Sequence, residues 1–173
     1  YSSDPIFYLD SYKFFYNIDP DFAKNIAFDY INNYKESPIL LKAISFIADE
    51  IADYETESLI YRRLIKIQPE NIQAYRDLAF TYVKLGKYNL ASFMYNYIIK
   101  SKKNIDKIPD FQKIIYAEAS NLLLNNFIPN TFSSETIEQL KSFYSIDKWQ
   151  RFGSDYRIIF DWTDPFAECN IQF

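Results

Sequence analysis

The stretch that decides the fold is residues 71–100, which read NIQAYRDLAFTYVKLGKYNLASFMYNYIIK. Its first half repeats apolar residues at i, i+3, i+4 and i+7, the spacing of one helical face, at Tyr75, Leu78, Ala79 and Tyr82. Its second half carries a similar face, made of Tyr88, Ala91, Tyr95, Ile98 and Ile99. Gly86 lies between them, and glycine readily adopts the positive φ that often ends a helix. The stretch therefore predicts a hairpin of two helices.

The same pattern recurs about 34 residues earlier in the chain. The shift carries Tyr95 onto Tyr61, Tyr88 onto Tyr54, Leu78 onto Ile44 and Tyr75 onto Leu41. Pro69 then closes the earlier unit, as a helix-ending residue should. Two positions depart from the pattern, because Ala52 replaces the turn glycine and Glu57 stands where a small residue belongs. The sequence thus predicts a second hairpin with the same plan.

This order of large and small apolar residues resembles the tetratricopeptide repeat (TPR), a helical hairpin of about 34 residues. The resemblance implies a right-handed stack of hairpins, in which the first helix of each hairpin lines a concave surface. A stack of this kind needs a terminal helix that covers its last apolar face.

Three further stretches set the wider order of the chain: PIFYLD at 5–10, YRDLA at 75–79 and DYRIIFDW at 155–162. This order is similar to bacterial multidomain proteins in which an inter-alpha-trypsin-inhibitor-type domain and a von Willebrand A-type domain precede TPR-like helices and a small β-domain. After its Trp, that β-domain usually has an alternating acidic run, and here Glu168, Asn170 and Ile171 match it loosely. The resemblance implies a location in the bacterial cell envelope or outside the cell, and it implies no catalysis in this segment.

Capping signals predict the remaining helices. Asp4-Pro5, Asp19-Pro20 and Ser37-Pro38 each place an N-cap residue before a proline suited to the first helical position. We expect helices over about 5–16, 20–34, 38–52 and 54–67, and a capping helix over 109–126. The side chains expected to face inward on the first two and on the capping helix include some of Phe7, Tyr8, Phe14 and Phe15, then Phe22, Ile26, Tyr30 and Ile31, and then Phe111, Ile114, Ile115, Ala119, Leu122 and Leu123.

The fold prediction is mainly α: about three helical hairpins in a TPR-like superhelix, a capping helix and a short C-terminal β-ribbon. Residues 1–127 form the helical repeat domain, and 128–153 form a linker with a short helix from Ser134 to about Phe143. Residues 154–173 form the β-ribbon, because Tyr156, Ile158, Phe160 and Trp162 alternate with polar residues. The ribbon either leans on the helices or begins a larger β-domain.

Composition supports a folded, helical chain. Of the 173 residues, 49% are hydrophobic and 20% aromatic, which excludes an intrinsically disordered chain. The only two glycines are Gly86 and Gly153, and this scarcity favours helices over a β-rich fold with many tight turns.

Charge and hydropathy exclude two classes of partner. The chain has 19 basic and 23 acidic residues and no basic block, so we expect no binding to nucleic acid. No apolar stretch reaches the ~18 residues of a membrane span, so we expect no membrane insertion. The sequence begins with Tyr1 instead of methionine, and no stretch resembles a signal peptide. We therefore expect a fragment of a longer or processed chain.

The residue types that most catalytic sites need are missing. Histidine is absent, which removes the commonest general base and the commonest metal ligand. Cys169 is the only cysteine, so no internal disulfide forms and its thiol has no histidine to activate it. Asp161, Asp164 and Glu168 could hold a hard cation, but such residues are more often solvated in turns and strands. We expect no enzyme activity, no cofactor and no metal.

The best candidate site is the groove that the first helices of the hairpins would line. Phe46 and Phe80 occupy the same place in successive repeats, and Lys42, Arg76 and Lys84 flank them. Such a surface suits an apolar peptide segment with an acidic neighbour. Alternatively, other parts of the chain cover the two rings. The predicted groove residues are Ile39, Lys42, Phe46, Asp49, Gln73, Arg76, Phe80, Val83 and Lys84.

The sequence favours a non-catalytic scaffold for protein–protein interaction, with a protein or peptide segment as partner. One alternative is a structural spacer that positions a β-domain within a multidomain chain. Another is an accessory segment of an enzyme whose active site lies elsewhere. A scaffold should leave Phe46 and Phe80 exposed to solvent, whereas a spacer should bury them under its own chain.

Overall fold

The protein is described here by a computed structural model that covers residues 4–101, 111–125 and 132–143. These residues form the helices α1 Pro5–Tyr16, α2 Pro20–Asn33, α3 Pro38–Glu50, α4 Tyr54–Ile67, α5 Ile72–Lys84, α6 Tyr88–Lys100, α7 Phe111–Asn125 and α8 Ser134–Phe143. The fold is therefore mainly α, as predicted. The predicted β-ribbon at 154–173 lies outside the described residues. None of the helices described is long and apolar enough to cross a membrane.

Local capping explains where the helices begin. The side chain just before each of the first five helices accepts a hydrogen bond from a backbone N–H in the first turn, at Asp4, Asp19, Ser37, Asp53 and Asn71. Such a bond satisfies one of the N–H groups that have no partner within the helix. Proline then occupies the start of α1, α2 and α3, where its missing N–H costs nothing. The predicted starts at Pro5, Pro20 and Pro38 are confirmed.

The turns inside the second and third hairpins have the same geometry. Gly86 has φ +68°, and Ala52, the matching residue of the earlier hairpin, has φ +59°. In each turn the next residue donates its backbone N–H to a carbonyl five residues back, from Lys87 to Tyr82 and from Asp53 to Ala48, both at 2.8 Å. This is the Schellman closure of a helix end. The predicted positive φ at Gly86 is confirmed.

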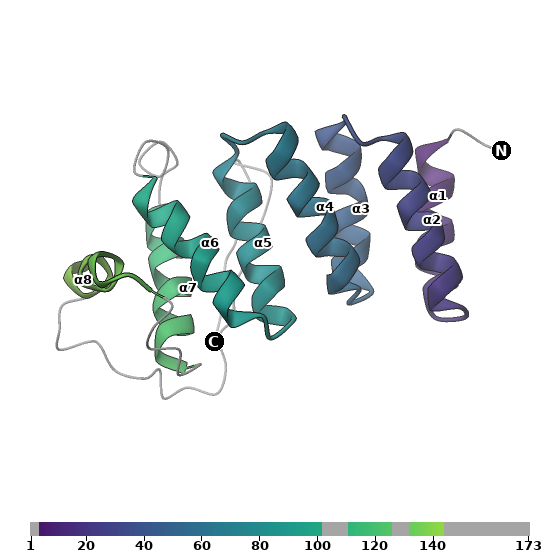
Figure 1. Ribbon diagram of the computed structural model, residues 1–173. Helices are drawn as coiled ribbons and strands as arrows, with labels where there is room; N and C mark the ends of the chain where they lie inside the picture. The colour runs from purple at the N-terminus through teal and green to yellow at the C-terminus, as the bar shows by residue number, and fades with distance from the viewer. Residues whose placement is uncertain (1–3, 102–110, 126–131, 144–173) are drawn as a thin grey trace, which may run out of the picture.

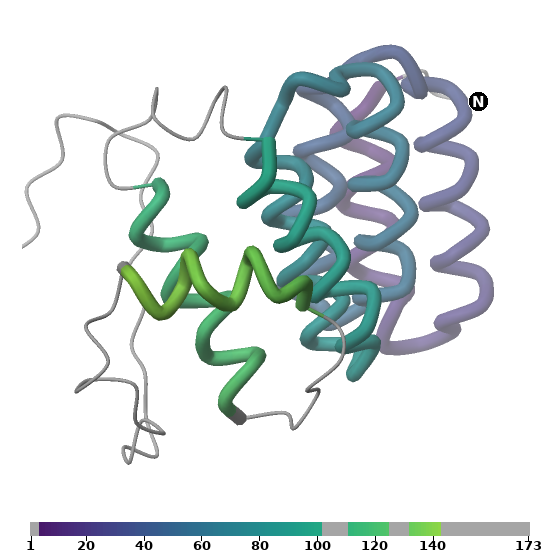
Figure 2. The backbone as a smooth tube through the Cα atoms, turned by 60° about the vertical axis from the view of Figure 1, so that its left-hand side comes forward, coloured from purple at the N-terminus to yellow at the C-terminus, as the bar shows by residue number. Residues whose placement is uncertain are grey.

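The hairpins α1–α2, α3–α4 and α5–α6 lie side by side in a row (Figure 1). The helices α3 and α5 begin at Pro38 and Ile72, and α4 and α6 begin at Tyr54 and Tyr88, so both pairs are offset by 34 residues. Contacts of α4 with α5 join the second hairpin to the third. The helix α7 packs on α6, and α8 runs across α7 and also contacts α6 (Figure 2). The chain is thus a helical repeat with two further helices at one end.

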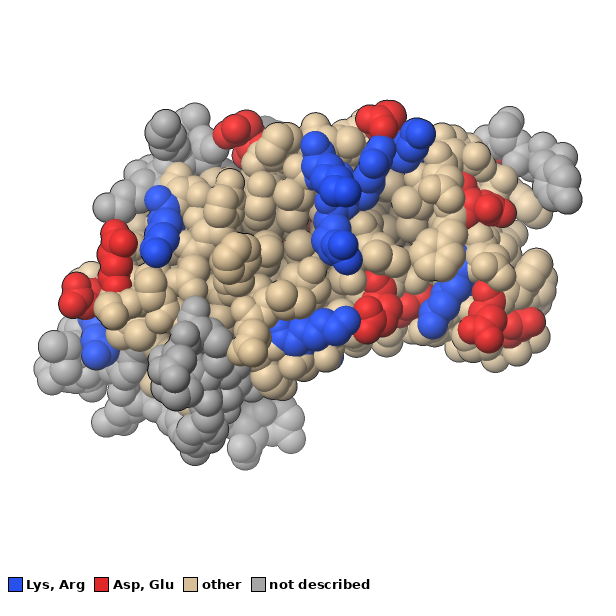
Figure 3. Space-filling model, viewed as in Figure 1, with Lys and Arg blue, Asp and Glu red and all other residues tan. Residues whose placement is uncertain are grey.

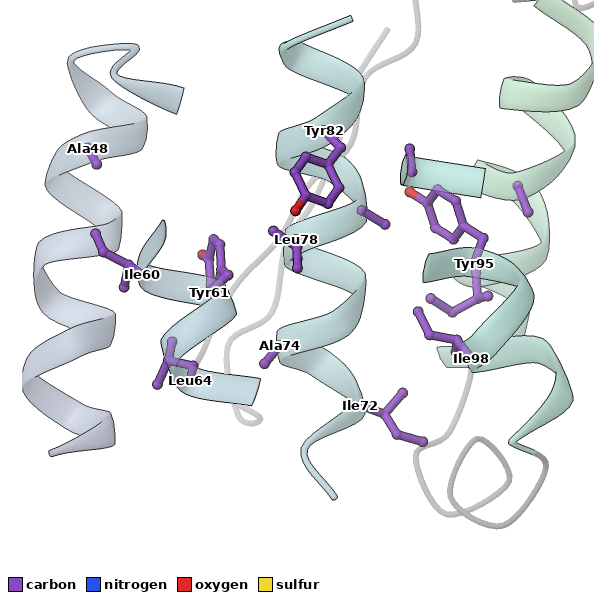
Figure 4. Close-up of a cluster of buried hydrophobic side chains, with 14 of the residues drawn as sticks. Ala48, Ile60, Tyr61, Leu64, Ile72, Ala74, Leu78, Tyr82, Tyr95 and Ile98 are labelled. Atoms are coloured by element: carbon purple, nitrogen blue, oxygen red, sulfur yellow. The ribbon is translucent and has the colours of Figure 1, made fainter. Parts of the chain in front are cut away.

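Large and small side chains alternate in the core between these helices. Ala48, Ala79 and Ala91 are fully buried and allow close approach of neighbouring helices. The larger Leu64 and Ile98 are also buried, and Figure 4 shows them between the helices. Of the six tyrosines predicted as core, Tyr61, Tyr82 and Tyr95 are buried, and Tyr54, Tyr75 and Tyr88 are half-buried.

Several aromatic residues do not face the core. Phe22 was expected to point inward, but 47% of its surface is exposed, because Ala23, Ala27 and Tyr30 occupy the inner face of α2. On α1 the buried residue is Tyr12, which leaves Phe14 on the far side of the helix. The remaining inward predictions divide in the same way: Phe7 and Ile114 are exposed, Tyr8, Phe15, Ile26, Ile31 and Leu123 are half-buried, and Phe111, Ile115, Ala119 and Leu122 are buried.

Candidate functional site

The predicted groove residues lie on α3 and α5, the first helices of the second and third hairpins; we call this surface the α3–α5 face. On α3, Ile39 and Phe46 are 80% and 61% exposed. They are seven residues apart and therefore lie on the same side of the helix, with half-buried Lys42 between them. The middle hairpin thus presents two uncovered apolar side chains with a cation between them.

On α5, Phe80 has a different environment from its repeat equivalent Phe46. It is half-buried, and the guanidinium carbon of Arg76 and the Nζ of Lys84 lie 5.6 Å and 4.9 Å from its ring centroid. These distances fit cation–π interactions on the ring. Lys84 also lies 4.9 Å from the ring centroid of Tyr54 and pairs with Asp49 of α3. Lys84 therefore links the second and third hairpins, with the ring of Phe80 beside its ammonium group.

Arg76 is held by an internal ion pair. Its Nη2 and Nε donate to Oε1 and Oε2 of Glu118 on α7, at 2.6 Å and 3.1 Å, and both side chains are largely buried. The hydroxyl of Tyr95 donates to the same Glu118 Oε2 at 3.1 Å. Burial lowers the pKa of Arg76, but the hydrogen bonds and charge of Glu118 outweigh it and raise that pKa above its ordinary value. Arg76 thus anchors α7 to α5 rather than standing free for a partner.

The two remaining predicted groove residues on α5, Gln73 and Val83, also contact other residues of the protein. Gln73 Nε2 donates to Asp77 Oδ1 at 2.7 Å, and half-buried Val83 packs against the core. Burial raises the pKa of Asp77, although the charge of Arg76 opposes this rise. The structure therefore brings Asp49, Arg76, Phe80 and Lys84 into one network and leaves Ile39 and Phe46 open to solvent.

Sequence reasoning did not assign a role to Glu57, which the structure places between the second and third hairpins. This side chain is only 4% exposed, and among the described residues its Oε2 has no hydrogen-bond partner. Burial raises its pKa from 4.5 to about 7; Lys84 opposes the rise, and Asp49 adds to it. The sequence contained a signal for this burial. Glu57 stands at a repeat position where a small residue belongs, and such positions lie in the interface between helices.

The described residues contain no group of three or more histidine, cysteine or acidic side chains that could hold a metal ion. Asp161, Asp164, Glu168 and Cys169 lie outside the described residues. What the α3–α5 face offers chemically is apolar contact at Ile39 and Phe46 and charge at Lys42. No protein-family model and no curated protein matches this chain.

Proposed function

We propose that this protein is a non-catalytic scaffold for protein–protein interaction, built as a TPR-like stack, and that an extended segment of a partner binds across the α3–α5 face. The observation that carries the proposal is the exposure of Ile39 and Phe46, 80% and 61%, on the first helix of the middle hairpin. Both side chains lie outside the hairpin core and on the same side of α3, and exposed apolar groups gathered on one side of a helix are typical of interaction surfaces.

The partner segment that fits this face is apolar with an acidic neighbour. Ile39 and Phe46 offer contact to two apolar side chains, and Lys42 between them offers a cation to a carboxylate. An aromatic side chain that becomes buried in an interface often contributes a large share of the binding energy. Phe46 is therefore the expected anchor, and Lys42 mainly affects the association rate and its dependence on salt.

A structural spacer is the second candidate, and the pairing of Arg76 with Glu118 favours it. This buried pair, together with Tyr95, fixes the position of α7 on the third hairpin. A rigid connection of this kind suits a segment that positions a following domain, as in the bacterial multidomain architecture that the sequence resembles. An accessory segment of an enzyme remains a third proposal, which activity of a longer chain containing this segment would test.

The experiment that separates scaffold from spacer uses Phe46→Ala. Peptides that bind the parent chain are first selected from a displayed random library, and their affinities are then measured by fluorescence anisotropy. We expect Phe46→Ala to weaken binding by tenfold or more, because truncation of an interface anchor costs ~2 kcal/mol or more. The melting temperature should stay close to that of the parent, since an exposed ring contributes little to folding.

The matched control is Phe28→Ala, which removes an exposed phenylalanine from α2, outside the α3–α5 face. This variant should keep the parent affinity. Equal binding by the Phe46→Ala variant and the parent would contradict the scaffold proposal. A large fall in the melting temperature of Phe46→Ala would instead favour the spacer, because truncation of a covered phenylalanine costs ~3–5 kcal/mol.

A further inference from the structure

A second uncovered surface lies on α4 and α6, the second helices of the second and third hairpins, which face the viewer in Figure 1. On α4 the side chains Leu59, Arg62 and Lys66 are exposed, and on α6 the exposed side chains are Phe93, Tyr97 and Lys100. Leu59 and Phe93 occupy equivalent positions of the 34-residue repeat, as do Lys66 and Lys100. Both helices therefore display an apolar residue followed, two turns later, by a lysine; we call this surface the α4–α6 face.

The α4–α6 face contains a cavity of about 560 Å³ beside the C-terminal half of α6. Phe93, Tyr97 and Phe132 form its aromatic walls, and Lys100 contributes a cation. The wall is held in place, because the backbone N–H of Ser133 donates to Asn96 Oδ1 at 3.2 Å. Tyr97 is further fixed by stacking on Tyr75, with ring centroids 4.7 Å apart. The cavity is therefore an open, mostly apolar hollow with a single positive group.

The charge of this surface differs from that of the whole chain. The net charge is −4, yet Lys and Arg side chains gather at one place on the face shown in Figure 3. On α4, Arg62 and Lys66 are exposed and Arg63 is half-buried, and among the described residues only Arg63 of these three forms an ion pair, with Glu36. Among the residues that the structure describes, Lys100 of α6 also has no ion-pair partner. Lys100 at the cavity and Arg62 and Lys66 on α4 are thus available to an anionic partner.

We propose that the α4–α6 face is a second docking site, which binds a peptide segment of a partner protein with an aromatic or large aliphatic side chain next to carboxylates. The apolar side chain enters the cavity between Phe93 and Tyr97, and one carboxylate pairs with Lys100. Further carboxylates pair with Arg62 and Lys66 on α4. Both α4 and α6 pack on α5, and packed helices lie about 10 Å apart, so α4 and α6 lie within about 20 Å of each other and an extended segment of ten residues, which reaches about 33 Å, spans both.

A peptide fits this surface better than an anionic membrane does. The site is a hollow lined by aromatic side chains, whereas a lipid surface needs no hollow. The net charge of −4 also repels an anionic bilayer over the rest of the chain. Vesicles that contain phosphatidylserine serve as the test of this alternative.

The test uses a displayed library of random ten-residue peptides, selected on the 173-residue chain. We expect one group of the selected peptides to combine an aromatic or large aliphatic residue with two or more carboxylates. Peptides of that group should lose binding when Phe93 is truncated. Affinities are measured by fluorescence anisotropy on labelled peptides of that group. Phe93→Ala should weaken their binding by tenfold or more, and Lys100→Ala by about threefold to fivefold with a weaker dependence on salt.

Two control variants make the result specific. Phe28→Ala removes an exposed phenylalanine on α2, away from the cavity, and should not change the affinity. Phe46→Ala tests the α3–α5 face and should also leave these peptides bound, which keeps this inference separate from the proposed function. Melting temperatures establish that each variant is folded.

Three outcomes would overturn the inference. The first is selection that yields no peptide with this composition. The second is equal affinity of such peptides for the parent, Phe93→Ala and Lys100→Ala. The third is binding to phosphatidylserine vesicles that depends on Phe93 and Lys100 while the peptides do not bind, which would assign the face to a membrane surface.

Discussion

Replacement of Glu57 by Gln tests whether a buried carboxyl group makes the joint between the second and third hairpins sensitive to pH. Glu57 is 4% exposed, and burial raises its pKa from 4.5 to about 7. The chain contains no histidine, which would otherwise titrate in the same range. Burial also raises the pKa of Asp77, so the comparison must be made between variants rather than on the parent alone.

The sign of the effect follows from the higher pKa of Glu57 in the folded state. Between pH 4.5 and about 7 the folded protein holds this proton more tightly than the unfolded chain does. The resulting stabilisation is fully present below pH 4.5 and is lost as the pH rises through about 7. A shift from 4.5 to about 7, at 1.36 kcal/mol per pH unit, corresponds to about 3 kcal/mol. That is a large part of the 5–15 kcal/mol that typically stabilises a domain.

The assay is urea unfolding followed by far-ultraviolet circular dichroism at pH 5 and at pH 8. Glutamine keeps the size of the side chain but cannot ionise, so Glu57→Gln should gain about 2 kcal/mol in its free energy of unfolding relative to the parent between pH 5 and pH 8. Glu55→Gln is the matched control, because it removes an exposed carboxylate from the same helix, where Glu55 pairs with Lys87 at 2.8 Å. If Glu57→Gln and the parent show the same pH dependence, the reasoning about burial is refuted.

Substitutions at four further positions test the helix ends and the packing, each by urea unfolding. Gly86→Val should cost more than about 1 kcal/mol and Gly86→Asn less, because the φ of +68° is strained for a branched side chain while no atom lies within 4 Å of an added Cβ; equal losses would contradict this. Ala52→Gly should gain up to about 1 kcal/mol, since Ala52 already has φ +59°, and a loss would argue against strain there. Ala91→Leu should lose about 1–3 kcal/mol by overpacking a fully buried site, and an unchanged stability would show that the helices can separate. Glu118→Ala should lose about 3 kcal/mol because it removes both hydrogen bonds that Glu118 accepts from largely buried Arg76 and leaves the longer 3.4 Å ion pair with Asp77, and a near-neutral result would mean that water replaces the carboxylate.

The sequence was sufficient to place the helices, because the signals that start and end a helix are local. An N-cap residue and a following proline act within one turn, so α1 begins at Pro5 and α3 at Pro38, as predicted. The period of the apolar residues extends over a whole helix, and the predicted helix over 54–67 is the observed α4, Tyr54–Ile67. The offset of 34 residues between the hairpins is also a property of the sequence pattern, and the helix starts confirm it.

The sequence could not determine which apolar faces are covered. One fifth of the residues are aromatic, more than a small helical core can bury, so periodicity predicts an apolar face without naming the neighbour that covers it. Phe22 and Ile114 have the spacing of buried residues and are exposed. The pairing of Arg76 with Glu118 joins residues 42 positions apart, and only the packing of α7 brings them together.

Phe46 and Phe80 show the same limit at the candidate site. They are equivalent in sequence, yet Phe46 is exposed and Phe80 is half-buried. Phe80 has a cation on each side along its helix, Arg76 and Lys84. In the earlier repeat the residue equivalent to Lys84 is Glu50, a carboxylate that pairs with Lys13 of α1 and offers nothing favourable to an aromatic ring. The sequence pattern determines which residues are equivalent in successive repeats. The exposure of a side chain depends instead on the charges and helices that the tertiary structure places around it.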